Sequence, residues 1–186
     1  MNFLEKYNHP KNFRFSSFSF ALKEAHKRNH KIIVETGVSR GKEKFLFFVK
    51  KNWNDGMSTM IFSDYVKFIK GSLYSCDIKK KNLDNAKKFI KNNLDYVTFI
   101  HDDSINFLKN FQNKIDFLYL DSLDGQFVES SEHQLKEITA SLNLLKEDSL
   151  ILLDDKGVKT NLSLDFLKKN KYKIINETKS QVLLSL

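Results

Sequence analysis

Residues 32–37, Ile32-Ile33-Val34-Glu35-Thr36-Gly37, decide the fold class of this chain. A β-branched apolar run followed by Glu-Thr-Gly is typical of a buried strand that ends in a turn, because Gly37 can adopt the positive φ that brings backbone close to a ligand. A helical pattern then opens at 56–59, Gly-Met-Ser-Thr, which offers N–H groups and hydroxyls to an anionic group. The next strand pattern, 72–76, ends in Asp77, whose carboxylate can accept both hydroxyls of a ribose. This order predicts one half of a nucleotide-binding α/β unit.

Strand-like and helix-like segments alternate along the rest of the chain and are joined by short connections. Such alternation predicts a Rossmann-like, doubly wound α/β fold with a mostly parallel seven-stranded sheet, whose last two strands form an antiparallel hairpin. The strands are expected at 31–36, 72–77, 96–100, 115–120, 149–153, 171–176 and 180–186, and the helices at 15–29, 57–70, 81–93, 104–110, 129–145 and 162–169.

Length and composition predict a single domain over residues 1–186. A chain of 186 residues with 41% apolar residues can bury one sizeable core and is too short for two ordinary domains. Within it, residues 1–30 are expected to form an N-terminal helical extension and residues 38–54 an inserted segment.

The chain carries no apolar run long enough to span a bilayer and no signal-peptide pattern at its start. Its single cysteine, Cys76, falls in a predicted buried strand, which fits a reducing compartment. We therefore expect a cytoplasmic protein without a membrane partner. The apolar stretch 13–20 has two interpretations, a cover over the functional site or a homodimer contact.

The formal net charge of +8 is compatible with a nucleic-acid partner, since lysines neutralise phosphates and release counterions. However, the lysines are spread over many segments, such as 79–81, 87–88 and 168–169, and most fall on predicted helix faces. A solvated, lysine-rich surface is therefore favoured over a nucleic-acid groove.

Four short motifs follow one another at the ends of the predicted strands. They are Glu35-x-Gly37, the acid Asp77, the turn His101-Asp102-Asp103-Ser104 and the run Leu118-Tyr119-Leu120-Asp121. In this order they resemble the motifs of class I S-adenosylmethionine-dependent methyltransferases, over roughly residues 31–156. The chain departs from that pattern at the glycine motif, which is normally compact, because residues 38–54 separate Gly37 from Asp55-Gly56.

The resemblance implies that S-adenosylmethionine binds at the carboxyl ends of the strands. Asp77 would accept the ribose hydroxyls, Asp103 with Ser104 would meet the adenine edge, and Glu35 with Gly37 would face the methionine end. The expected cofactor-binding residues are Glu35, Thr36, Gly37, Ser58, Thr59, Asp77, Ile78, Asp103, Ser104 and Asp121.

Three further carboxylates suggest a metal site. Asp121, Asp154 and Asp155 end adjacent predicted strands, and three carboxylates with waters suit a hard divalent cation such as Mg²⁺. The arrangement resembles the metal site of catechol-type and sugar- or macrolide-type O-methyltransferases, in which the ion lowers the pKa of the acceptor hydroxyl. The alternative is an acidic pair that simply starts a loop.

The expected catalytic residues are Asp121, Asp124 and His133. Asp124 resembles the base of the sugar-type enzymes, at a spacing longer by one residue. His133 lies on the following predicted helix, and its alternative role is that of a surface or helix-capping histidine.

Residues 38–54 are expected to form a lid or short helix over the cofactor, whose Phe-rich centre contributes aromatic walls to the acceptor pocket. A packed surface insertion without substrate contact is the alternative.

Three functions remain open from the sequence. The first is metal-assisted O-methylation of a hydroxyl on a small polar metabolite. The second is methylation of RNA or protein; against N-methylation, the segment after the fourth strand reads Leu120-Asp121-Ser122-Leu123 and not an Asn-Pro-Pro-Tyr-like motif. The third is a non-catalytic Rossmann-like cofactor-binding module.

Overall fold

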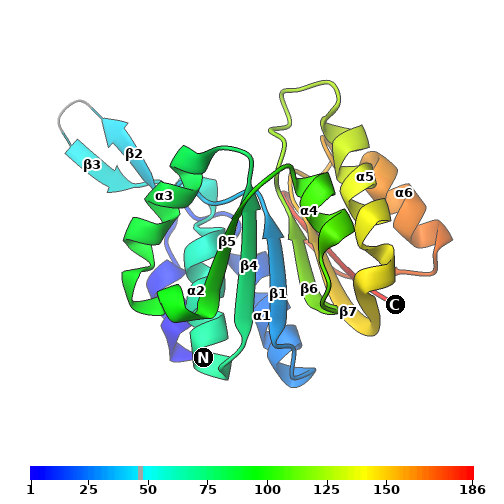
Figure 1. The fold of residues 1–186 in the computed structure, drawn as a ribbon, viewed down its shortest axis with the longest axis horizontal. Coiled ribbons are helices and arrows are strands. Elements are labelled where there is room, and N and C mark those ends of the chain that lie inside the picture. Colours follow the sequence, from blue (N-terminus) through cyan, green and yellow to red (C-terminus); the bar gives the residue numbers. More distant parts are fainter. Residues whose placement is uncertain (46–47) are drawn as a thin grey trace.

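A computed structural model describes residues 1–45 and 48–186, and it describes side chains outside residues 42–50. Seven strands form one sheet in the order β5-β4-β1-β6-β7-β9-β8 (Figure 1). The pairs from β5 to β7 are parallel, and β9 is antiparallel to both β7 and β8. The predicted Rossmann-like sheet with a C-terminal antiparallel hairpin is therefore confirmed. Its strands are β1 Ile32–Thr36, β4 Ser72–Asp77, β5 Val97–His101, β6 Ile115–Leu120, β7 Leu145–Leu153, β8 Lys173–Glu177 and β9 Val182–Ser185.

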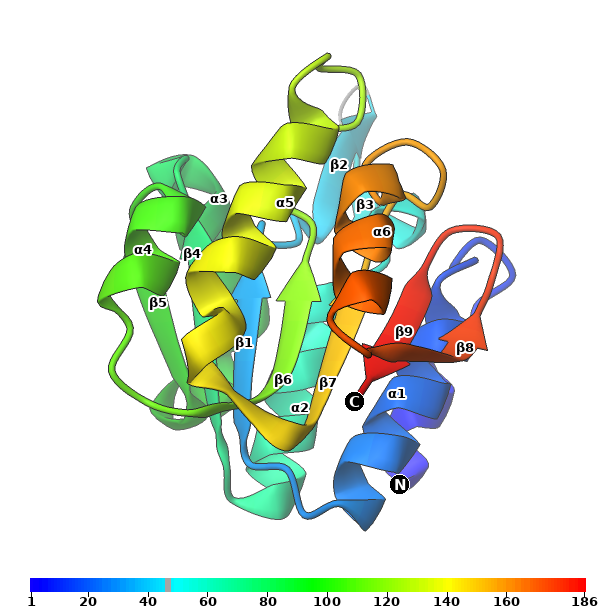
Figure 2. The ribbon, with the colours of Figure 1, turned by 90° about the vertical axis from the view of Figure 1, so that its right-hand side faces the viewer.

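Helices cover both faces of this sheet (Figures 1 and 2). Side chains alternate across β6, so that Phe117 and Tyr119 pack into one core while Leu118 and Leu120 pack into another. The first core contains residues of α1 and α2, and the second contains residues of α4, α5 and α6. The helices are α1 Phe15–Lys27, α2 Ser58–Ile69, α3 Lys80–Phe89, α4 Ser104–Asn110, α5 Ser130–Ser141 and α6 Asn161–Lys169, with short 3-10 turns η1 Asn2–Tyr7, η2 Trp53–Asp55, η3 Lys91–Tyr96 and η4 Leu142–Leu144.

Strand β7 begins earlier than the predicted 149, because its register with β6 shifts between Ile115 and Phe117. Ser149 stabilises this irregularity: its hydroxyl donates to the Ile115 carbonyl and accepts from the Lys146 N–H, both at 2.7 Å. A side-chain bond of this kind leaves no trace in the hydrophobic pattern.

The inserted segment contains a two-stranded antiparallel sheet, β2 Lys42–Phe45 and β3 Phe48–Lys51, where a lid or short helix was expected. The prediction of a short helix is therefore wrong for this part of the chain, because residues 42–45 and 48–51 pair as strands. Figure 1 shows the hairpin projecting beside α3. Leu46 and Phe47 lie outside the described residues, as do the side chains of 42–50, so the expected aromatic walls stay a prediction.

The N-terminal residues pack against the sheet through α1, which contacts β7, β8 and β9 (Figure 2). Within the described part of the chain, no helix is both long and apolar enough to cross a membrane.

Candidate functional site

The carboxyl ends of the central strands form one continuous edge. Backbone bonds extend the ladder beyond the strands: the N–H of Gly37 donates to Cys76 O at 2.9 Å, that of Asp121 to Thr36 O at 2.9 Å, and that of Asp154 to Leu120 O at 3.2 Å. The side chains that follow β1, β4, β6 and β7 are therefore held in a row, which is where parallel α/β sheets bind ligands.

Gly37 makes this edge tight. Its φ is +83°, and a Cβ at this position would lie 2.2 Å from the backbone oxygen of Asp121. Both the left-handed conformation and the close approach require glycine here.

Three adjoining cavities lie along this edge of the sheet. The β5-side cavity, of about 280 Å³, is lined by residues that include Asp77, Ile78, Asp103, Ser104 and His133. The central cavity, of about 130 Å³, shares Gly37, Asp77 and Ser122 with it. The acidic cavity, of about 230 Å³, shares Asp121 and Asp124 with the central one, so the three form a continuous series.

Asp77 is held at the border of the β5-side and central cavities. Its carboxylate accepts from the N–H groups of Val38 at 3.1 Å and Lys79 at 2.7 Å and from the Asn82 amide at 3.0 Å. A carboxylate can accept about four hydrogen bonds, so it retains capacity for a ligand hydroxyl. Ile78 beside it is 65% exposed and lines both cavities.

Asp103 and Ser104 begin α4 at the far wall of the β5-side cavity. One carboxylate oxygen of Asp103 caps the helix by accepting from the N–H groups of Ile105 and Asn106, each at 3.0 Å. The hydroxyl of Ser104 lies 3.0 Å from Nε2 of His133. His133, expected as a base, thus lines the same cavity as Asp103 and Ser104, and its catalytic role stays a prediction.

Glu137 lies four residues after His133 on α5 and was not predicted from the sequence. Its carboxylate oxygen is 3.7 Å from Nε2 of His133, and its side chain is 1% exposed. Burial raises the pKa of Glu137, while the nearby imidazole opposes that rise. The four-residue spacing of His133 and Glu137 on a predicted helix already indicates that their side chains are neighbours.

Glu35 lines none of these three cavities, whereas the sequence predicted that it faces the methionine end of the cofactor. It is fully buried, and it accepts hydrogen bonds from the hydroxyls of Ser58 at 2.5 Å, Thr59 at 2.9 Å and Ser75. Burial raises its pKa to about 7, although these hydroxyls lower it. The hydroxyls of Ser58 and Thr59 are thus engaged by Glu35 and not presented to an anionic ligand group; this corrects the expectation. Thr36 is also fully buried.

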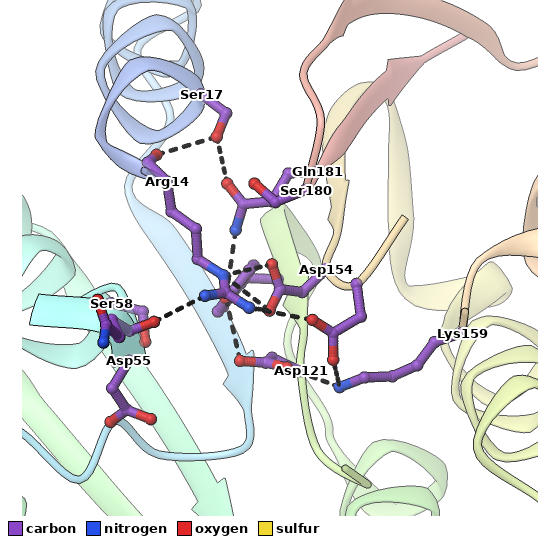
Figure 3. A network of polar contacts seen from close by, with 12 residues as sticks. Arg14, Ser17, Asp55, Ser58, Asp121, Asp154, Lys159, Ser180 and Gln181 are labelled. Atoms are coloured by element: carbon purple, nitrogen blue, oxygen red, sulfur yellow. Dashed lines mark hydrogen bonds and ion pairs between the residues drawn. The ribbon is translucent and has the colours of Figure 1, made fainter. Parts of the chain in front are cut away.

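The three carboxylates expected to hold a metal do converge. One oxygen each of Asp121, Asp154 and Asp155 lies within 4.8 Å of the others, and we call these residues the acid cluster. Two cations contact the cluster (Figure 3), Arg14 from the residue before α1 and Lys159 from the segment between β7 and α6.

Lys159 bridges two members of the acid cluster. Its ammonium lies 2.7 Å from Asp121 Oδ1 and 3.0 Å from Asp155 Oδ2, and its side chain is 3% exposed. Burial alone would lower the pKa of Lys159, but Asp121 and Asp155 raise it, so it stays an ammonium. Its position four residues after Asp155 was a usable signal, whereas nothing in the local sequence singled out Arg14.

Asp121 also accepts a hydrogen bond from Tyr119, the residue two positions before it. Tyr119 donates to its Oδ2 at 3.3 Å, and the Gln181 amide donates to the Tyr119 hydroxyl at 3.3 Å. Burial and the Asp154 carboxylate raise the pKa of Asp121, and Lys159 opposes them. Asp124 is exposed and lines the central and acidic cavities.

A family model described as a methyltransferase domain matches residues 53–156, more than half of the chain. The chain belongs to this family. It is a class I S-adenosylmethionine-dependent methyltransferase, as its motifs imply. No curated protein sequence matches it.

Solved structures share the fold of this methyltransferase at low identity. An S-adenosylhomocysteine-bound methyltransferase of Podospora anserina, PaMTH1, is 14% identical with a TM-score of 0.66, over 98% of this chain and 85% of that one. A structure described as a putative rRNA methylase from Clostridium thermocellum is 18% identical with a TM-score of 0.64, over 94% and 97%. The O-methyltransferase NovP is 12% identical with a TM-score of 0.66, over 92% and 78%.

The β5-side and central cavities fit the cofactor of the methyltransferase. Asp77 offers acceptor capacity suited to a ribose hydroxyl, Asp103 and Ser104 offer polar groups suited to an adenine edge, and Gly37 brings backbone to the wall that both cavities share. The acid cluster has the oxygen donors that Mg²⁺ prefers, but all three carboxylates already pair with Arg14 or Lys159. A divalent ion therefore does not fit the cluster in this arrangement.

Proposed function

We propose that this methyltransferase methylates a hydroxyl of a small polar metabolite. The observation that carries the proposal is the acidic cavity, which adjoins the central cavity at Asp121 and Asp124 and is the size of a small molecule. If adenine occupies the β5-side cavity and the ribose meets Asp77, the methionine end points towards Asp121. The acceptor then lies in the acidic cavity.

The lining of the acidic cavity supports a polyhydroxylated acceptor. It contains the carboxylates of Asp55, Asp121, Asp124 and Asp155, together with two arginines and two asparagines. Carboxylates accept hydrogen bonds from hydroxyl groups and fix their orientation. Four carboxylates against two guanidinium groups and the Lys159 ammonium still leave a net negative charge, which disfavours a polyanion, so RNA is the less favoured acceptor despite the basic surface.

In this proposal Asp121 is the general base. S-adenosylmethionine supplies a methyl group already activated by its sulfonium. Asp121 accepts the hydroxyl proton as the acceptor oxygen attacks the methyl carbon, and S-adenosylhomocysteine leaves. Lys159 and Tyr119 hold the Asp121 carboxylate in place, whereas Asp124 is exposed and better suited to bind the acceptor.

We further propose that residues 38–54 act as a lid-like segment within a single domain, with residues 1–30 as its N-terminal extension. Arg40, Asn52 and Asn54 line the acidic cavity, and Arg14 lines it from the N-terminal side. Both segments thus contribute walls where water must be excluded from the reaction.

Metal-assisted transfer is the second candidate, favoured by the convergence of three carboxylate oxygens within 4.8 Å. It requires Arg14 and Lys159 to leave the acid cluster.

The proposal is tested by supplying purified protein and S-adenosylmethionine with a panel of sugars, phenols and ribosomal RNA, and measuring S-adenosylhomocysteine release. We expect turnover with a hydroxylated metabolite. Asp121→Asn should lower kcat about 100-fold or more, because general bases contribute at least that much. It should leave S-adenosylhomocysteine affinity within about threefold, a difference under 1 kcal/mol. The matched control, Asp165→Asn on the exposed face of α6, should behave as wild type. Faster turnover of RNA, or full activity of Asp121→Asn, would overturn the proposal.

A further inference from the structure

Two cationic side chains of the chain itself pair with the acid cluster. The Lys159 ammonium lies between Asp121 and Asp155, at 2.7 and 3.0 Å from their oxygens, which is the usual range for charge-assisted hydrogen bonds. A cation shared by two carboxylates supplies the positive charge that a bound metal ion would otherwise supply.

Arg14 contacts Asp154, which Lys159 does not reach, and also contacts Asp155. Its Nε and Nη2 contact Asp154 at 2.8 and 2.7 Å, Nη2 also contacts Asp155 at 3.0 Å, and Nη1 donates to the Asn54 carbonyl at 2.9 Å. This planar, multidentate arrangement uses the fork geometry of a guanidinium and leaves little freedom for a different position.

Both cations are placed by dedicated local structure. A turn in which the Lys159 N–H donates to the Asp155 carbonyl at 3.0 Å directs Lys159 back onto the cluster. Gly56 leaves room for Arg14, because a Cβ on Gly56 would lie 2.8 Å from Arg14 Cδ. Figure 3 shows the two side chains reaching the cluster from different elements.

The charge balance opposes a further ion. Three carboxylates with two fixed cations carry a net charge of −1, and adding a divalent ion would reverse that sign in a site where Asp154 and Lys159 are almost fully buried. Displacing Lys159 would leave a buried ammonium without its partners.

We propose that Arg14 and Lys159 are the resident cations of this site, and that they replace a divalent metal ion in holding Asp121 and Asp155. It follows, resting on the proposed function, that methyl transfer in this protein proceeds without a metal.

The test reads ion binding and not turnover, so it can fail independently of the proposed function. Mn²⁺ is titrated into the purified full-length protein and the free ion is followed by electron paramagnetic resonance. We expect no saturable site below about 1 mM in the wild type, a Kd that corresponds to only about −4 kcal/mol. Lys159→Met should bind Mn²⁺ at least about tenfold more tightly, because it frees two carboxylates without a competing charge.

Two matched variants complete the test. Lys159→Arg keeps a cation and should exclude Mn²⁺ as the wild type does. Lys156→Met removes a lysine that pairs with Glu177, outside the cluster, and should do the same. A micromolar Mn²⁺ site in the wild type that Asp154→Asn abolishes would overturn the inference. So would a Lys159→Met variant that folds, by circular dichroism, and still excludes Mn²⁺. If Lys159→Met does not fold, the wild-type titration and the Asp154→Asn variant decide the question.

Discussion

Arg14 and Asp154 lie 140 positions apart in the sequence and form a bidentate ion pair, with Nε and Nη2 of the guanidinium at 2.8 and 2.7 Å from the carboxylate oxygens. The carboxylate is fully buried, and the guanidinium side chain is 12% exposed. The pair joins the residue before α1 to the residue after β7, so the N-terminal segment and the sheet edge are ordered together.

Removing Arg14 should destabilise the protein strongly. Arg14→Gln leaves the Asp154 carboxylate buried without its partner, and we expect it to lower the free energy of unfolding by about 3–5 kcal/mol. Arg40→Gln is the matched control, since Arg40 is 57% exposed and pairs with Asp55, and should cost under about 1 kcal/mol. Urea unfolding of both variants gives the comparison. Adding Asp154→Asn to Arg14→Gln should recover part of the loss, and equal losses in the two single variants would contradict the assignment.

Gly37 should tolerate no side chain. Gly37→Ala combines a left-handed backbone with a Cβ 2.2 Å from Asp121 O, and we expect a loss of about 2–5 kcal/mol in unfolding free energy. Gly157 has nearly the same φ, +81°, but no atom outside Gly157 and its two chain neighbours lies within 4 Å of the position that its Cβ would take, so Gly157→Ala should cost only about 1–2 kcal/mol. Thermal and urea unfolding of both variants separate steric overlap from backbone strain. Indistinguishable variants would show that β1 and β6 approach less closely than described.

Asp77 should govern cofactor affinity. Asp77→Asn removes the charge that strengthens hydrogen bonds from ribose hydroxyls, so S-adenosylhomocysteine should bind with a free energy weaker by about 1.5–3 kcal/mol in calorimetric titration. Asp84→Asn makes the same change on the exposed face of the neighbouring helix α3 and should leave affinity unchanged. Equal affinities in the two variants would refute the ribose assignment.

Glu35 should make stability depend on pH near neutrality. Its pKa rises on folding from the ordinary 4.5 to about 7, so between these values the folded protein binds a proton that the unfolded chain has released. The stabilisation that this bound proton gives the folded state is therefore complete below about pH 4.5 and is lost as the pH rises through 7. The free energy of unfolding should fall by about 3 kcal/mol in total from this group.

The measurement is the free energy of unfolding from pH 5 to 8 for the wild type and Glu35→Gln. The variant stays neutral, so the difference between the two proteins should change across this range, with the wild type losing more stability at high pH. Parallel curves would mean that Glu35 is ionised throughout.

The positions of the sheet's strands along the chain, the acids that end them and the family were all accessible from sequence. An apolar run such as 32–34 marks a strand through local periodicity, and parallel strands bring their carboxyl ends to one edge, so Asp77, Asp121 and Asp154 were expected along that edge. These inferences depend on neighbours within a few residues and on a simple rule of topology.

The tertiary structure alone decided how those acids are used. Glu35 turns inward to three hydroxyls, His133 lies beside Ser104, and Arg14 and Lys159 pair with the acid cluster. A periodic pattern reports which residues are buried, but not which distant side chain will meet a buried charge. That choice depends on the mutual position of elements far apart in the chain, and the cost of leaving a charge unpaired makes it energetically important.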